Sequence, residues 1–209
     1  MVNSIACILG RLEQYDDLAV VYQKVRYKIS DSIRSKRRPR TTWDQVERAF
    51  NEAKISDLTS EALLACYVLH PPRLAQDYQL IRFTRKKKDT SDSSYNWLYR
   101  NSFYFNKFKM KKKTGKQIIK LNPMLQTILN EYTRDFKNKE FLFGRTRNIY
   151  RDNFSTVVKN TFDKELGINL TLNELRRIYI YKFCYNPKTM KEREKYMNII
   201  REMGGGLTI

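Results

Sequence analysis

The segment His70–Tyr78 reads His-Pro-Pro-Arg-Leu-Ala-Gln-Asp-Tyr and places Arg73 at the end of an apolar run, behind two prolines. A second cluster, Asn173–Tyr179, reads Asn-Glu-Leu-Arg-Arg-Ile-Tyr and places Arg176 in a similar setting far downstream. The planar fork of an arginine can hold two phosphate oxygens and stays charged at any physiological pH, whereas a lysine supplies a point charge and a transferable proton. Two arginines and a lysine that converge on one point would suit a phosphodiester.

The charge balance predicts an anionic partner. The 209 residues include 41 Lys and Arg against 22 Asp and Glu, a net charge of +19, and nucleic acid is the commonest partner of so basic a chain. A membrane surface is the rival anion, but no apolar run approaches the roughly 20 residues that span a bilayer, so we expect no membrane partner. The N-terminus lacks the basic and apolar regions of a signal peptide, so we expect a protein that is not secreted.

The cysteines and the single histidine predict no metal site and no cofactor. Cys7, Cys66 and Cys184 are odd in number, widely spaced and set among apolar residues, which is typical of buried thiols rather than of a disulfide framework or a zinc site. His70 is followed by Pro71 and is interpreted as structural. With one histidine, the usual Ser/His and Cys/His catalytic sites are disfavoured.

A basic linker is predicted to divide the chain into two domains. Residues 1–33 carry apolar side chains at helical spacing and predict a small N-terminal helical domain. Residues 34–41 form a predicted linker dense in positive charge, in which Arg37, Arg38 and Arg40 are candidate DNA contacts. The second domain is predicted to span residues 42–209.

The second domain is predicted to be α+β and mainly helical. Capping-box residues open two of its helices, Thr42 with Gln45 and Thr171 with Glu174, while Asn122 and Pro123 open another. The predicted helices are Thr42–Phe50, Thr59–Leu69, Pro123–Tyr132, Asp152–Leu166, Thr171–Cys184 and Pro187–Met203, and the predicted strands are Tyr78–Phe83, Asn96–Tyr99, Phe103–Phe108 and Gln117–Leu121.

Two lysine runs have open interpretations. The last two predicted strands flank Lys109–Lys116, a basic hairpin tip that is either a solvated turn or a DNA contact through Lys111, Lys112 and Lys116. Lys86, Lys87 and Lys88 lie in a polar loop. Like the linker, they are interpreted either as a nuclear localisation signal (a nuclear address) or as a phosphate contact. Sequence alone does not separate these alternatives.

Taken together, the Pro-Pro-Arg…Asp-Tyr segment, the lysine hairpin and the Leu-Arg pair near the start of a helix resemble the tyrosine recombinase (phage integrase) family, in particular its divergent members in large eukaryotic DNA viruses and virophages. The three motifs occur in the family's order from about Thr42 onward. The resemblance implies a catalytic domain with a small three-stranded sheet, preceded by a helical domain that helps to clasp duplex DNA. It also implies DNA breakage and rejoining through a 3′-phosphotyrosyl intermediate, without a cofactor or metal.

The resemblance also assigns roles to individual residues. Arg73 and Arg176 would clamp the scissile phosphate, with Asp77 orienting Arg73 and Arg177 in a supporting position. Lys113 would be the general acid, with Lys109 as the alternative. Asn173 stands where most family members carry a histidine, and an asparagine can hydrogen-bond a phosphate oxygen but cannot shuttle a proton near neutral pH.

Two departures from the family pattern limit what the resemblance implies. Met203-Gly204-Gly205 stands where the family has Met-Gly-His, and no tyrosine follows Tyr196 to serve as nucleophile. The expectation is therefore a C-terminally truncated, recombinase-like DNA-binding protein that lacks its nucleophile.

The alternatives are a non-enzymatic DNA-binding remnant, packaged or regulatory, and an RNA-binding module. Self-association is expected to be weak in isolation and to strengthen on DNA. The expected location is the cytoplasm or nucleus of an infected host cell, or the virion.

Overall fold

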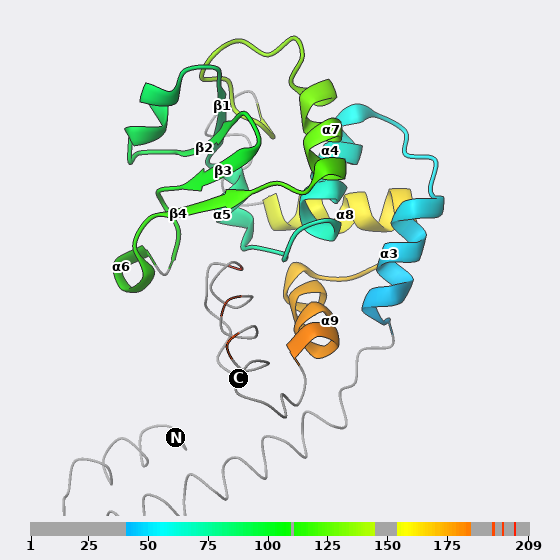
Figure 1. Cartoon of the computed structure of the whole chain (residues 1–209). Helices are drawn as coiled ribbons and strands as arrows, with labels where there is room; N and C mark the ends of the chain where they lie inside the picture. Colours follow the sequence, from blue (N-terminus) through cyan, green and yellow to red (C-terminus); the bar gives the residue numbers. More distant parts are fainter. Residues whose placement is uncertain are drawn as a thin grey trace, which may run out of the picture. The chain divides into compact units, whose positions relative to one another are not determined.

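The computed structural model describes residues 41–109, 111–144 and 154–184, together with Glu194, Asn198 and Met203 (Figure 1). All of them belong to the unit that begins at Thr41. Its elements are, in chain order, α3 (Trp43–Glu52), α4 (Leu58–Val68), α5 (Ala75–Gln79), β1 (Ile81–Thr84), the 3-10 helix η2 (Lys87–Ser91), β2 (Asn96–Tyr99), β3 (Ser102–Phe105), α6 (Lys111–Thr114), β4 (Gln117–Lys120), α7 (Pro123–Tyr132), α8 (Phe154–Leu166) and α9 (Leu172–Cys184).

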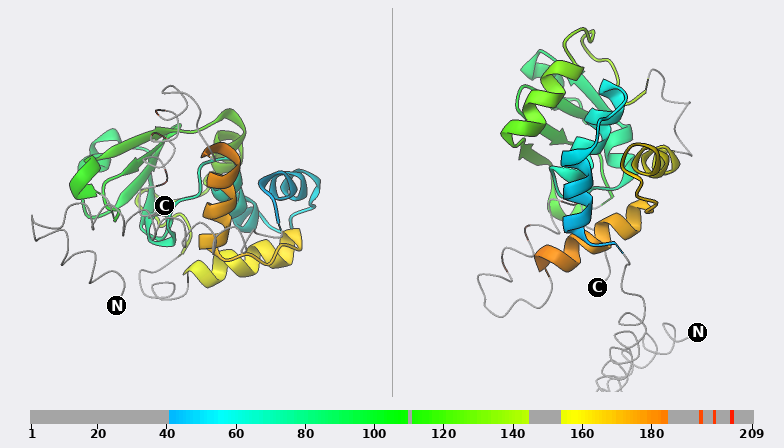
Figure 2. Two further views of the ribbon diagram at one scale, coloured as in Figure 1. Left: turned by 90° about the horizontal axis from the view of Figure 1, so that it is seen from below. Right: turned by 90° about the vertical axis from the view of Figure 1, so that its right-hand side faces the viewer.

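The unit is α+β, as predicted. Figures 1 and 2 show the sheet on one side of the unit and α3, α8 and α9 on the other. The predicted N-terminal helices and the linker with Arg37, Arg38 and Arg40 lie outside the described residues. So does Tyr196, and of the predicted last helix only Glu194, Asn198 and Met203 are described.

Helix starts follow the predicted capping signals. Thr42 Oγ1 accepts from Gln45 N at 3.4 Å and Gln45 Oε1 accepts from Thr42 N at 2.8 Å, which completes the capping box of α3. At the start of α9, Glu174 Oε2 accepts from Thr171 N at 2.8 Å and Thr171 Oγ1 accepts from Glu174 N at 3.3 Å. Asn122 Oδ1 accepts from Leu125 N at 2.7 Å at the start of α7. Each cap satisfies N–H groups that the first helical turn leaves without partners.

The core is built around α4. Every residue from Ala62 to Val68 is buried, because α3, α7 and α8 all pack against this helix. A helix that is apolar on all sides is stable only when other elements enclose it. The predicted buried thiol is confirmed for Cys66, and burial raises the pKa of that thiol.

The sheet has four strands, so the three-stranded sheet that the family resemblance implies was wrong, whereas the residue pattern predicted a strand near each of the four. The strand order is β1-β2-β3-β4, with β1 parallel to β2 and the other pairs antiparallel. The additional strand, β1, is covered on its outer edge by residues 139–142, since Phe83 N donates to Glu140 O at 2.8 Å and Leu142 N donates to Ile81 O at 2.9 Å. This pairing supplies backbone partners that an edge strand otherwise lacks.

The strand predicted at Tyr78–Phe83 was placed too early. Ala75–Gln79 forms the short helix α5, and the strand begins at Ile81. The Tyr78 hydroxyl donates to the carbonyl O of Cys66 at 3.0 Å in the core. A short apolar run is compatible with a helix or a strand. Here the run contains the end of a helix, in which Tyr78 hydrogen-bonds to Cys66 of α4.

The basic hairpin forms, but its tip is longer than predicted. β3 ends at Phe105, paired with Gln117 of β4, and the connection contains the helical turn α6. Gly115 ends this turn with a φ of +73°, a conformation that glycine adopts without the steric cost that a side chain incurs.

Replacing Leu64 by alanine tests the central place of α4. Leu64 is fully buried, so Leu64→Ala should lower the free energy of unfolding by about 2–5 kcal/mol, because it leaves a cavity in a packed core. Leu58→Ala on the same helix is the matched control, since Leu58 is 46% exposed. Urea unfolding followed by circular dichroism measures both, and equal losses in the two variants would contradict the core assignment.

Candidate phosphate-binding site

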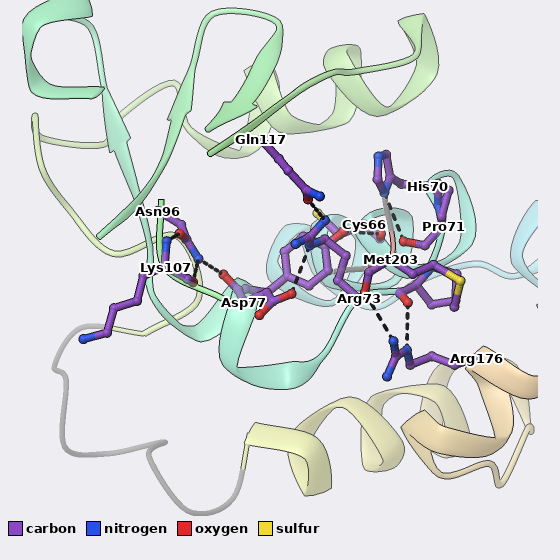
Figure 3. A network of polar contacts seen from close by, with 12 residues as sticks. Cys66, His70, Pro71, Arg73, Asp77, Asn96, Lys107, Gln117, Arg176 and Met203 are labelled. Atoms are coloured by element: carbon purple, nitrogen blue, oxygen red, sulfur yellow. Dashed lines mark hydrogen bonds and ion pairs between the residues drawn. The ribbon is translucent and has the colours of Figure 1, made fainter. Parts of the chain in front are cut away.

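The fold brings Arg73 and Arg176 together. Arg73 lies between Pro72 and the start of α5, and Arg176 lies one turn inside α9. Arg176 Nε donates to the carbonyl O of Pro72 at 3.2 Å (Figure 3). The second arginine therefore touches the residue that directly precedes the first.

Arg73 is fully buried and is held from two elements. Its Nε donates to Asp77 Oδ2 at 3.0 Å, and its Nη1 donates to Gln117 Oε1 at 3.0 Å. Its guanidinium carbon lies 3.7 Å from the centroid of the Phe105 ring. The ion pair, the amide and the aromatic face together define one orientation of the fork, which matches the role predicted for Asp77.

Arg176 is equally buried and joins three parts of the chain. It is 1% exposed, and besides its bond to Pro72 its Nη2 donates to the carbonyl O of Met203 at 3.2 Å. Met203 is itself buried and begins the Met-Gly-Gly segment noted in the sequence. Gly204 and Gly205 lie outside the described residues.

Burial dominates the electrostatics of the cluster. Desolvation raises the pKa of Asp77 to about 6, although the positive charge of Arg73 opposes this shift. Desolvation also lowers the pKa of Arg176, and the nearby charge of Arg73 lowers it further, while Asp77 acts in the opposite direction. The two guanidiniums thus repel each other, and an anion bound beside them would relieve that repulsion.

Two residues of the site were not predicted. Gln117 is the first residue of β4, and its Oε1 accepts from Arg73. Asn96 is the first residue of β2, and its Nδ2 donates to the carbonyl O of Asp77 at 2.7 Å. The Asn96 Oδ1 also accepts from the backbone N of Asn106 at 2.9 Å and of Lys107 at 2.7 Å. The available signal was an amide side chain at the first position of each strand.

Among the side chains that the structure describes, no hairpin lysine makes a hydrogen bond within the arginine cluster. Lys116 Nζ donates instead to the carbonyl O of Thr90 at 3.0 Å. Lys109 is exposed and lines a hollow of about 560 Å³ with Leu74–Gln76, Gln79 and the start of α8. Lys111 and Lys112 lie in α6, where Lys112 is exposed, and the side chain of Lys113 lies outside the description. The choice of a general acid between Lys113 and Lys109 stays a prediction.

Asn173 and Arg177 do not join the buried cluster. Both side chains are exposed on α9, while Arg176 between them on the helix is buried. Asn173 lies three residues before Arg176, on a neighbouring part of the same helical surface. Arg177 makes a minor contribution to lowering the pKa of Glu174, and its supporting role at the phosphate stays a prediction.

His70 has a structural setting. It is 6% exposed, and its Nδ1 lies 3.1 Å from the carbonyl O of Pro71. Its ring meets the Phe103 ring edge-on, at 6.5 Å between centroids. Burial lowers the pKa of His70 to about 4, so the ring is neutral near pH 7.

Comparison with known proteins adds no relative. No protein-family model matches the sequence, and no curated protein matches it significantly. Within the described residues, no group of three or more His, Cys, Asp and Glu side chains is arranged to hold a metal ion. No helix in that part of the chain has the length and apolar character needed to cross a membrane.

The buried neutral His70 makes stability depend on pH. The unfolded chain takes up a proton on this ring below about pH 6.5 and the folded chain only below about pH 4. The contribution of His70 to the free energy of unfolding therefore falls as the pH is lowered through this window, by up to about 3 kcal/mol.

Wild type and His70→Gln, compared by urea unfolding between pH 4 and pH 7, isolate this contribution. The stability advantage of wild type should shrink as the pH falls. Asp77, whose raised pKa acts in the opposite sense between about pH 4 and pH 6, is present in both chains and cancels in the difference. A difference that does not vary with pH would contradict the assignment.

Proposed function

We propose that the protein binds duplex DNA and holds one phosphodiester at Arg73 and Arg176, in the manner of the tyrosine recombinases that its motifs resemble. The observation that supports this most strongly is the convergence of the two arginines. They come from distant parts of the chain, and Arg176 hydrogen-bonds to Pro72, directly beside Arg73.

The chemistry of the pair suits a phosphodiester. Two guanidiniums present planar sets of donors that match phosphate oxygens, and Asp77 and Gln117 hold one of them in a set direction. In the family chemistry such a pair neutralises the charge that builds on the phosphorus in the transition state. The net charge of +19 adds a long-range attraction to the DNA backbone.

A purely structural role for the two arginines competes with this proposal. The burial of both arginines favours the structural role. At 0% and 1% exposure, Arg73 and Arg176 also act as ties between Pro72, Met203 and the sheet. A phosphodiester would have to take an acceptor position now held by a protein oxygen, such as that of Met203. The two roles differ in what an Arg→Lys substitution does to the folded protein.

Arg73→Lys and Arg176→Lys, with Arg48→Lys as the control, test the proposal. Arg48 is exposed on α3. Each site variant should weaken binding of a fluorescein-labelled duplex by about ten-fold to a hundred-fold, because lysine keeps the charge but loses the fork and its charged hydrogen bonds. Fluorescence anisotropy well below the melting temperature of each variant measures this loss, and Arg48→Lys should bind as wild type does.

The structural role predicts a different result. In that case both site variants melt at lower temperature, but their folded forms bind the duplex with unchanged affinity. For wild type, log affinity should fall with log salt at a slope of about 0.9 per phosphate neutralised on B-DNA. A flat salt response would contradict duplex binding itself.

Strand breakage is a separate question from binding. A duplex with a 5′-bridging phosphorothiolate does not need a general acid, because the thiolate is a good leaving group. A covalent protein–DNA adduct on a denaturing gel with this substrate would identify a recombinase-type enzyme. Binding without an adduct would favour the non-enzymatic DNA-binding alternative.

A further inference from the structure

The loop between β1 and β2 presents three exposed lysines from a firmly held backbone. Lys86, Lys87 and Lys88 are all exposed, whereas the next two residues, Asp89 and Thr90, are 8% and 5% exposed. The reversal from exposed to buried occurs within η2. The lysines therefore form one small positive surface, called here the η2 surface.

Asp89 anchors this surface to the rest of the unit. Its Oδ2 accepts from Thr84 Oγ1 at 2.7 Å and from Asn138 Nδ2 at 3.0 Å, and Lys139 Nζ lies 3.4 Å from its Oδ1. These hydrogen bonds lower the pKa of Asp89 to about 2, so the anchor stays charged at neutral pH. One carboxylate thus joins η2 to β1 and to the segment that follows α7.

Two side chains of the same turn hydrogen-bond to the backbone carbonyl groups of the lysines. Thr90 Oγ1 donates to the carbonyl O of Lys87 at 2.8 Å, and Ser91 Oγ donates to the carbonyl O of Lys88 at 2.7 Å. A receptor that reads a short basic peptide needs a segment that can leave the protein surface and fit its groove. Releasing η2 would break these bonds and those of Asp89, so the structure disfavours the nuclear-address interpretation.

The lysines themselves are not engaged in ion pairs with any described carboxylate. The neighbouring Arg85 differs, because its Nη1 and Nη2 donate to the carbonyl oxygens of Phe136 and Arg134 at 2.7 and 3.1 Å. Arg85 is thus used to hold the loop, whereas Lys86, Lys87 and Lys88 direct positive charge to solvent. Like charges held this close repel each other, and a polyanion relieves that repulsion.

The start of β4 connects the η2 surface to the arginine pair. Lys116 Nζ donates to the carbonyl O of Thr90 at 3.0 Å, and the next residue, Gln117, accepts from Arg73. Asn106 Nδ2 also donates to Thr90 O at 3.0 Å, from the end of β3. The adjacent residues Lys116 and Gln117 therefore contact η2 and Arg73, respectively. The η2 surface and the arginine pair thus lie beside the same hairpin.

We propose that the η2 surface is a second phosphate-binding surface, which contacts the backbone of the same duplex at phosphates away from the one held by Arg73 and Arg176. This inference rests on the proposed function. The rigid, outward display of three lysines suits phosphate contacts that need charge and position but no base recognition. The surface adds affinity and sets the direction in which the duplex leaves the arginine pair.

The double variant Lys87→Ala/Lys88→Ala tests this surface in the full chain, with Arg48→Ala/Lys54→Ala as the matched control. The control removes two exposed cations from α3 and the residues after it. Anisotropy titrations of a labelled 30-base-pair duplex between about 50 and 300 mM salt give the slope of log affinity against log salt. The η2 variant should lose about 1.8 from the magnitude of this slope and bind about ten-fold more weakly at low salt.

Each outcome of this experiment has a definite meaning. A reduced slope in the η2 variant, with the wild-type slope kept in the control, supports the second surface. An unchanged slope in the η2 variant overturns it but leaves the arginine-pair proposal intact, since wild type still binds. Equal reductions in both double variants also overturn it, because they indicate diffuse charge attraction. If wild type shows no salt-dependent binding, the proposed function and this surface fail together.

The nuclear-address interpretation is tested in the same variants. Full-length fusions to a fluorescent protein report nuclear accumulation in eukaryotic cells. Loss of accumulation in Lys87→Ala/Lys88→Ala with an unchanged salt slope would overturn the phosphate surface. Retained accumulation together with a reduced slope supports it.

Discussion

The guanidinium of Arg73 is enclosed between Asp77, Gln117 and the Phe105 ring, and this enclosure joins the helical part of the unit to the sheet. Removing one partner of a buried ion pair costs about 3–5 kcal/mol, whereas replacing both by apolar groups is often neutral. Stability alone therefore does not require a charged pair here. A ligand of opposite charge, such as the proposed phosphate, would give the buried charges a role beyond stability.

The remaining polar structure is arranged around that enclosure. Asn96 supports the backbone of Asp77 and closes the end of the β2–β3 pair. Arg176 extends the cluster to α9 and to Met203. On the other side of Gln117, the contact from Lys116 to Thr90 continues to the η2 surface. Positive side chains from the start of α5, from α9 and from η2 thus lie around one hairpin, and under the proposed function a long anion such as duplex DNA would contact more than one of them.

The candidate site was predictable where the signal is local. Arg73 and Asp77 are four residues apart, so their pairing involves only neighbouring residues at the start of α5, and Arg176 follows a capping box that the sequence shows directly. Gln117 and Asn96 were missed because their partners Arg73 and Asp77 lie at and in α5, far from them in sequence, and a strand residue carries no local sign of what it faces. The exposure of Asn173 and Arg177 beside a buried Arg176 likewise depends on which face of α9 the core covers.

The sequence by itself determined the class of the fold, the starts of α3, α7 and α9, the buried thiol of Cys66 and the basic charge that predicts an anionic partner. These depend on side-chain capping, apolar spacing and composition, which act over a few residues or over the whole chain. Only the tertiary structure decided that Tyr78 lies in a helix, that β1 pairs parallel to β2 in a single four-stranded sheet, and that Asp89 anchors η2 to other parts of the chain. Each of these depends on hydrogen bonds between residues distant in sequence, such as Tyr78 to Cys66 and Asn138 to Asp89, and the geometry of such bonds exists only once the chain has folded.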